Sequence, residues 1–154
     1  MEDMKQVKII TAQEAAQLVK DGDVVTTNGF VGSGQPEALT SALEERFLNT
    51  GSPKDLTLIY AASQGNTDGR GGDHFAHEGM LKKAILGHWN AVTSLQKLVN
   101  ENKIQAYNLP QGTLSQYFRD VAAHRLGTIT HVGLDTFADP RISGGRLNAV
   151  SYTH

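Results

Sequence analysis

Apolar, β-branched runs alternate with helical patterns along this chain, and the alternation limits its possible folds more than any other feature. The pattern predicts strands at residues 24–27, 56–61, 84–86, 104–106 and 128–132. It predicts helices from Thr11, from Pro36, and at residues 75–83, 91–102 and 113–124. Parallel neighbouring strands need a crossover connection, which is usually a helix. Strands that alternate with helices therefore indicate a parallel sheet. We therefore predict an α/β fold of three layers, with a mostly parallel sheet and flanking helices.

Local signals mark the helix ends. Thr11 and Glu14 have capping-box spacing, and Pro36 suits the first turn of a helix, where its missing N–H costs nothing. We expect the helix from Pro36 to bury Leu39, Ala42, Leu43 and Phe47. The helix at 113–124 has the clearest apolar stripe, made of Leu114, Tyr117, Phe118, Val121 and Ala122.

Composition narrows the class of protein. The chain has 154 residues, the usual size of one domain, with 39% apolar and 19% charged residues. The net charge is −2 and no Lys/Arg run occurs, so neither a nucleic acid nor an anionic membrane is predicted as a partner. There is no cysteine, which excludes disulfides, thiolate metal sites and cysteine nucleophiles. Residues 1–8 carry both charge signs and predict neither a signal peptide nor a membrane span, so we expect a cytoplasmic protein.

The first candidate site is a glycine-rich loop between a strand and a helix. Gly29, Gly32 and Gly34 allow the backbone to come close to a ligand, and the next helix presents free N–H groups to an anion or an oxyanion. The loop lacks the Gly-Lys-Ser/Thr of nucleoside triphosphate sites. A ligand loop and a tight turn both fit this pattern.

The second candidate site is the segment before the helix at 113–124. Pro110 fixes the chain, Gly112 permits close approach, and Gln111 is placed to donate a hydrogen bond to a carbonyl oxygen. The alternative is a polar segment that only caps the helix.

Three other motifs favour structural interpretations. His74 and His77 could share a helix face, but the spacing is not His-Glu-x-x-His, so we predict that they cap, pair or pack and that no metal is bound. Ser33 does not sit in a Gly-x-Ser-x-Gly nucleophile elbow. Arg70 could clamp an anion, although an ion pair with Asp68 is the simpler expectation.

Several motifs in one order resemble a known family. They are residues 28–39 (Asn-Gly-Phe-Val-Gly-Ser-Gly-Gln-Pro-Glu-Ala-Leu), 63–79, 87–89 (Gly-His-Trp), 101–108, 110–112 (Pro-Gln-Gly) and 136–148. Over about residues 5–150 the chain resembles family I CoA-transferases of the propionate/acetate type.

The resemblance implies an enzyme that moves CoA from an acyl-CoA to a free carboxylate through a glutamyl-CoA thioester. It implies a site that binds substrate or stabilises an oxyanion, built from Gly29, Phe30, Gly32, Gly34, Gln35, Gln64, Gly65, Gln111 and Gly112. The implied partners are acyl-CoA and short carboxylates, with CoA as substrate, no cofactor or metal, and a homo-oligomer at full length.

The chain departs from the family pattern in its nucleophile and in residues 151–154, which do not continue the pattern after Leu147-Asn148. The family's nucleophilic glutamate lies in a second lobe, and none of the seven glutamates here matches its motif. We expect residues 1–150 to be an incomplete amino-terminal lobe, residues 151–154 to be an unrelated or truncated tail, and the fragment to be inactive alone, with no catalytic residue of its own. The alternatives are a non-catalytic subunit or binding module that pairs with a separate carboxyl-terminal lobe, and a histidine-based metal hydrolase.

Overall fold

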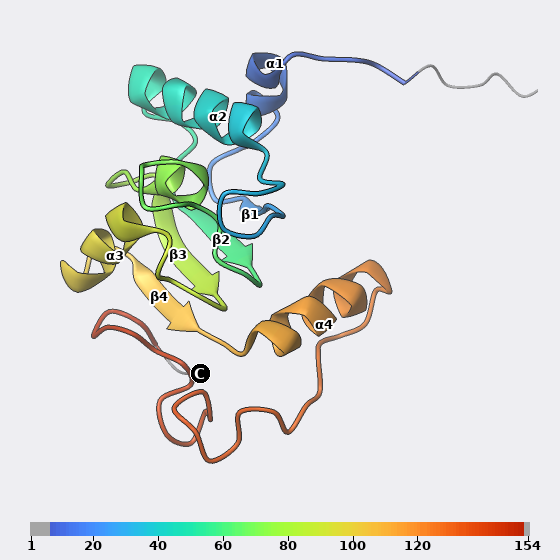
Figure 1. Cartoon of the computed structure of the whole chain (residues 1–154), viewed down its shortest axis with the longest axis vertical. Coiled ribbons are helices and arrows are strands. Elements are labelled where there is room, and N and C mark those ends of the chain that lie inside the picture. Colours follow the sequence, from blue (N-terminus) through green and yellow to red (C-terminus); the bar gives the residue numbers. More distant parts are fainter. Residues whose placement is uncertain (1–6, 153–154) are drawn as a thin grey trace, which may run out of the picture.

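Four parallel strands form one sheet in the order β1-β2-β3-β4 within residues 7–152, the part of the chain that this computed structural model describes. The elements in chain order are α1 (Ala12–Ala16), β1 (Val24–Thr26), α2 (Glu37–Thr50), β2 (Leu56–Tyr60), the 3-10 helix η1 (Gly71–Phe75), β3 (Leu81–Leu86), α3 (Thr93–Asn100), β4 (Gln105–Asn108) and α4 (Gln111–Ala122). Figure 1 shows the strands pointing the same way, with α4 apart from the other helices. The predicted α/β class with a parallel sheet is confirmed.

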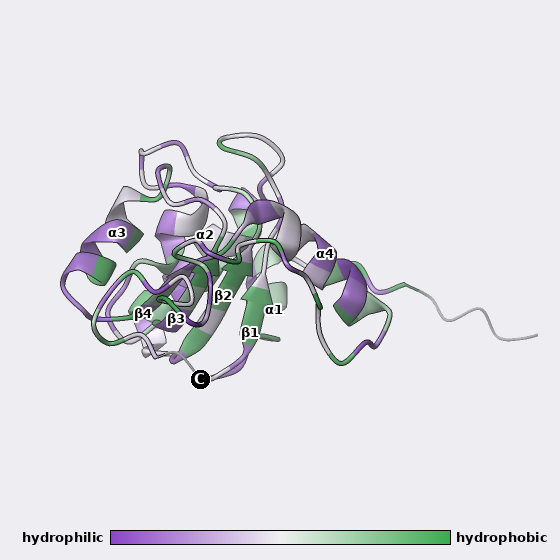
Figure 2. Cartoon of the chain, turned by 90° about the horizontal axis from the view of Figure 1, so that it is seen from below, coloured by the Kyte–Doolittle hydropathy of each residue, from purple (hydrophilic) through white to green (hydrophobic). Residues whose placement is uncertain are grey.

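The core lies between the sheet and one layer of helices. Leu58 of β2 pairs in register with Ala84 of β3, which pairs with Ala106 of β4, and all three side chains are fully buried. Side chains alternate along a strand, so this row faces the same side of the sheet. Leu43 of α2 and Leu95 of α3 belong to the same buried cluster. Figure 2 shows α2 and α3 on one face of the apolar strands.

The helix ends follow their sequence signals. Thr11 Oγ1 accepts from the Glu14 N–H at 3.1 Å, and the Thr11 N–H donates to Glu14 Oε2 at 2.8 Å, so the predicted capping box is confirmed. Pro36 stands at the N-cap of α2. Gly51 ends that helix in the left-handed conformation, with its N–H on the Phe47 carbonyl, because glycine carries no Cβ to oppose a positive φ.

Two predicted elements are wrong. Residues 75–83 do not form a helix, because the chain leaves η1 and enters β3, where pairing with β2 from Leu56 to Tyr60 outweighs the local helical pattern. Residues 128–132 do not form a strand; Ile129 is fully exposed, and no neighbouring strand within residues 7–152 pairs with this segment. The prediction that Leu39 is buried is also wrong, since 47% of that residue is exposed.

The segment after α4 is held by turns and by contacts with β4. The carboxylate of Asp139 is buried and accepts from the N–H groups of Asp135 and Arg141. Ser151 Oγ accepts from the Ala106 N–H at 2.8 Å, which fastens residue 151 to β4. The domain boundary at residue 150 remains a prediction. Across residues 7–152, no helix has the length and apolar character needed to cross a membrane.

Candidate functional site

The candidate site lies where the four parallel strands end, which we call the carboxyl edge of the sheet. Each strand is followed there by a loop: residues 28–35 after β1, residues 61–70 after β2, residues 87–92 after β3, and Leu109–Pro110 after β4. Ligands of open parallel sheets bind at this edge, because only there do the loops between strands and helices converge. The first sequence candidate is one of these loops, and the second spans the loop after β4 and the start of α4.

The first of these loops, residues 28–35, is here called the glycine loop, and hydrogen bonds fasten it to the loop after β2. The Val31 N–H donates to the Ser63 carbonyl at 2.8 Å, and the Gly65 N–H donates to the Val31 carbonyl at 2.9 Å. Gln64 adds a side-chain clamp, because its Nε2 donates to the Thr27 carbonyl at 2.7 Å and its Oε1 accepts from Thr27 Oγ1 at 2.6 Å. The loops therefore form one wall.

A cavity of about 390 Å³ lies between this wall and the start of α4, and we call it the smaller cavity. Phe30 and Val31 line it from the glycine loop and Gln111 lines it from α4, so residues about eighty positions apart share one hollow. The remaining lining residues are Ser63, Asn66, Thr67, His88, Asn90 and Ala91. The lining combines apolar contact area with amide, hydroxyl and imidazole groups.

The amino terminus of α4 faces this hollow through Gln111, its first residue. No side chain among the described residues caps this helix. Its first N–H groups, including that of Gly112, are therefore free to donate to a ligand. The positive end of the helix dipole favours negative charge at the same place. Gly87 allows the close approach, since a Cβ there would lie 2.6 Å from Gln111 Cγ and 2.1 Å from the Ala61 carbonyl oxygen.

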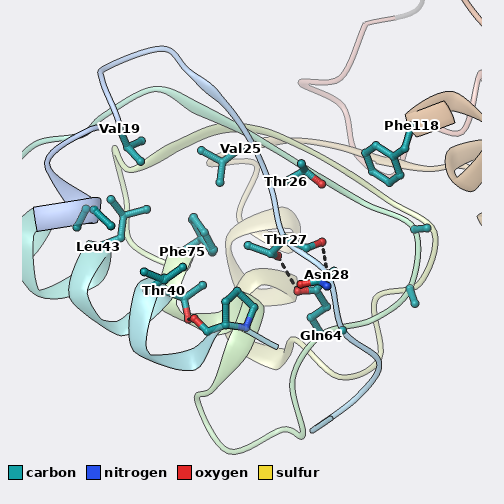
Figure 3. A pocket seen from close by; sticks show the side chains of 17 residues that line it. Val19, Val25, Thr26, Thr27, Asn28, Thr40, Leu43, Gln64, Phe75 and Phe118 are labelled. Carbon is teal, nitrogen blue, oxygen red and sulfur yellow. Dashed lines mark hydrogen bonds between the residues drawn. The ribbon is translucent and has the colours of Figure 1, made fainter. Parts of the chain in front are cut away.

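A second, apolar cavity of about 780 Å³ is lined by Thr27 and Gln64, the two residues of the clamp, neither of which lines the smaller cavity. Figure 3 shows Val25, Leu43 and Phe75 around it, with Phe118 of α4 at its margin. β1 borders it and pairs with β2 only, so the outer edge of β1 is open among the described residues.

The structure brings together some of the residues predicted for the site. Phe30 and Gln111 line the smaller cavity, whereas Gly29 and Gln64 line the apolar one. The others lie outside both linings. Gln35 is turned inward, Gly65 packs against the Ala91 carbonyl, Gly112 is open to solvent, and Gly32 and Gly34 complete the turn.

Gly29 has a φ of 132°, and a Cβ there would lie 2.9 Å from the Gln35 backbone nitrogen. Its lack of a side chain is therefore needed inside the turn as well, so the ligand-loop and tight-turn interpretations both apply to this loop.

His74 and His77 pair with carboxylates, which is one of the structural roles predicted for them. His74 lies between Glu37 and Glu44, and His77 contacts Glu44. Among residues 7–152, no group of three or more histidine or acidic side chains is arranged to hold a metal ion. Arg70 lies 3.4 Å from Asp68, the simpler of its two predicted roles.

Sequence reasoning missed His88 and Asn90 as lining residues. A signal was available, because Gly87-His88 comes directly after a predicted strand, and loops at the ends of parallel strands converge. The contributions of Ser63, Asn66 and Thr67 depend on how the loop after β2 curls back, and the local sequence carries no such signal.

Comparisons with known proteins agree with this geometry. The family model described as Coenzyme A transferase matches residues 9–152. Acetate CoA-transferase YdiF of Escherichia coli K12 is 40% identical over 94% of this chain, and caffeate CoA-transferase of Acetobacterium woodii is 38% identical over 94%. Crystal structures of YdiF from Escherichia coli O157:H7, as apoenzyme and as a thioester complex with CoA, superpose with TM-scores of 0.90 and 0.88 at 38% identity, covering 95% and 93% of this chain. The chain spans only 28% of the length of both relatives, and 28% and 30% of the two crystallised chains.

Proposed function

Because the chain belongs to the coenzyme A transferase family, we propose that it supplies one wall of an active site that moves CoA between a short-chain acyl-CoA and a free carboxylate. The observation that carries this proposal is the shared hollow of the glycine loop and Gln111 at the carboxyl edge of the sheet. Each of the two also carries a ligand-binding pattern in the sequence.

The chemistry of CoA transfer explains why such a wall is useful. When a carboxylate attacks a thioester, negative charge develops on the carbonyl oxygen, and hydrogen-bond donors fixed in advance lower the barrier. We assign that role to the first N–H groups of α4 and to the side-chain amide of Gln111. Phe30 and Val31 would contact the short acyl chain, since both line the same cavity.

The attacking carboxylate belongs to polypeptide outside this chain in our proposal. The described lining of the smaller cavity includes no aspartate or glutamate, so no carboxylate borders the place where the thioester carbonyl would sit. We therefore expect the chain alone to bind thioester weakly and to catalyse no transfer.

We propose acetate and propionate as the carboxylates, and a cytoplasmic homo-oligomer at full length. The names of the relatives include acetate and caffeate, so acids of very different size are used within the family. We further propose that the second lobe covers the apolar cavity and the open edge of β1, because apolar surface of that extent is rarely left bare.

Two measurements test the proposal. The purified chain is first incubated with propionyl-CoA and acetate, and acetyl-CoA is followed by chromatography. We expect no acetyl-CoA above the protein-free control, and sustained turnover would refute the assignment of the nucleophile.

Binding of propionyl-CoA is then measured by calorimetry for wild type and Gln111→Ala. Gln13→Ala is the matched control, because Gln13 is exposed on α1 and outside both cavities.

We expect Gln111→Ala to bind propionyl-CoA about fivefold to tenfold more weakly than wild type, the effect of one lost hydrogen bond. Gln13→Ala should bind as tightly as wild type. Equal affinity in all three proteins would contradict the proposed role of Gln111.

A further inference from the structure

Five side chains form a continuous hydrogen-bonded series from the glycine loop into the layer of helices. Gln35, the last residue of the loop, donates from Nε2 to Glu37 Oε2 at 3.3 Å. Glu37 Oε1 lies 2.8 Å from His74 Nε2, and His74 Nδ1 lies 2.6 Å from Glu44 Oε2. Glu44 Oε1 in turn lies 2.5 Å from His77 Nε2. Glu37 and Glu44 are on α2, and His74 is on η1, so the series ties these two elements together.

The geometry favours the protonated form of His74. Both of its ring nitrogens face carboxylate oxygens, and an ionised carboxylate only accepts hydrogen bonds. A neutral imidazole has one donor, which would leave a nitrogen lone pair against an oxygen lone pair. An imidazolium satisfies both contacts. The His74 side chain is 10% exposed, whereas those of Glu37 and Glu44 are 39% and 25% exposed, so water screens these interactions in part.

The surrounding charges support the imidazolium. Burial opposes the charged form of His74, but hydrogen bonds to Glu37 and Glu44 outweigh it and raise the pKa of the ring. Burial likewise opposes ionisation of Glu37, and contacts with His74 and the Gly71 N–H outweigh it and lower the pKa of that carboxyl. The other charged neighbours are Asp73, whose carboxylate interacts with His74, and Arg70, whose charge acts on Glu37.

Glu37 connects this charge to the glycine loop. Its Oε2 accepts from the Gly71 N–H at 3.1 Å as well as from Gln35 Nε2. Gln35 Oε1 is buried and has no partner among the described residues, so the contact with Glu37 is the one that holds this amide. A change in the charge or position of Glu37 therefore reaches Gln35, at the end of the glycine loop. The same loop carries Phe30.

We propose that His74 is a positioning residue for the candidate site: as an imidazolium between Glu37 and Glu44 it holds Glu37, and through Gln35 it fixes the glycine loop. The role in catalysis rests on the proposed function, whereas the coupling of His74 to the loop does not. Loss of the proton removes one of the two contacts and loosens the loop, so the loop becomes less ordered as the pH rises through the titration of His74.

The experiment is a pH titration of the isotope-labelled chain by NMR between pH 5 and 9. The ring signals of His74 report its proton, while the Gln35 side-chain amide and the Phe30 backbone amide report the loop. We expect His74 to lose its proton at a higher pH than a free histidine, and both loop signals to shift with the same midpoint. A His74 midpoint at or below that of a free histidine, or loop signals that do not follow its titration, would overturn the proposal.

Two variants with matched chemistry sharpen the test. Glu44→Gln removes the negative partner of Nδ1, whereas Glu45→Gln changes an exposed carboxylate one position along the same helix. We expect the first to lower the shared midpoint of His74 and the loop signals, and the second to leave it in place. A midpoint unchanged in Glu44→Gln would overturn the proposal, and the wild-type titration decides the matter alone if that variant does not fold.

Propionyl-CoA binding, measured across the same pH range, separates this inference from the proposed function. We expect affinity to fall by about fivefold or more as His74 loses its proton, within the usual range for coupled sites. Affinity that stays constant while the loop signals shift would overturn the positioning role. Failure to bind at every pH would refute the proposed function, and the NMR midpoints would still decide whether His74 holds the loop.

Discussion

Asp73 supplies the hydrogen-bond acceptor that the start of α3 lacks in its own sequence, and this makes its removal measurable. The N-cap of α3 is Val92, which has no side-chain acceptor. Asp73 Oδ1 accepts instead from the N–H groups of Ser94 at 3.0 Å and Leu95 at 3.3 Å. Asp73→Ala should therefore uncap α3 from a distance of about twenty residues in the chain.

The expected size follows from these contacts. Losing an N-cap acceptor costs about 1 kcal/mol. The Leu95 contact is buried, so its N–H finds no water as a substitute, which brings the estimate for Asp73→Ala to about 2 kcal/mol. For a chain of this length, that lowers Tm by roughly 4–8 °C.

Asp73→Asn separates the acceptor from the charge. The amide oxygen can still accept both N–H groups, so we expect stability within about 1 kcal/mol of wild type. Burial raises the pKa of Asp73 above its ordinary 3.8, so the folded state binds the proton more tightly than the unfolded state. Wild type should therefore lose stability relative to Asp73→Asn as the pH rises from 3.8 through the folded pKa.

Urea denaturation of the three proteins at several pH values measures both effects. If Asp73→Ala matches wild type, the distant cap contributes nothing. If Asp73→Asn is as unstable as Asp73→Ala at neutral pH, the charge and not the acceptor stabilises α3, and the reasoning is refuted.

Three further predictions follow from single contacts. Thr11→Ala removes the capping box of α1 and should cost about 1 kcal/mol in urea denaturation; an unchanged midpoint would contradict it. Gly87→Ala places a Cβ 2.1 Å from the Ala61 carbonyl oxygen. We expect the free energy of unfolding to fall by about 2 kcal/mol or more, as at other overpacked sites, and the NMR signals of Gln111 to shift. Wild-type stability would refute the close approach. Tyr60→Phe removes a buried hydroxyl that has no partner among the described residues. The free energy of unfolding, measured in urea, should therefore stay equal or rise by up to about 1 kcal/mol. A clear loss of stability would reveal a partner for that hydroxyl.

Local sequence signals predicted the elements that depend on local chemistry. The capping box at Thr11, the proline before α2 and the amphipathic start of α4 act within one or two turns of chain. Each could be read without knowledge of the neighbours. The glycine loop and Gln111 were found in the same way, since a turn and a helix mouth are local features.

The errors share a different cause. β3 carries Lys82 and Lys83 within an otherwise helical pattern, and only its pairing between β2 and β4 makes it a strand. Ile129 is β-branched and has a high strand propensity, but no strand of the described chain pairs with it. The Glu37–His74–Glu44 series joins residues 30 to 37 positions apart, so no local pattern could indicate it.

The central claim is that the glycine loop and Gln111 bind one thioester between them. The most direct measurement is a titration of the labelled chain with propionyl-CoA, followed through the backbone amides by NMR. We predict that the signals of Phe30 and Val31 and those of Gln111 to Thr113 shift together, with one dissociation constant, while those of exposed α1 stay in place. Shifts confined to one of the two segments, or none in either, would contradict the claim.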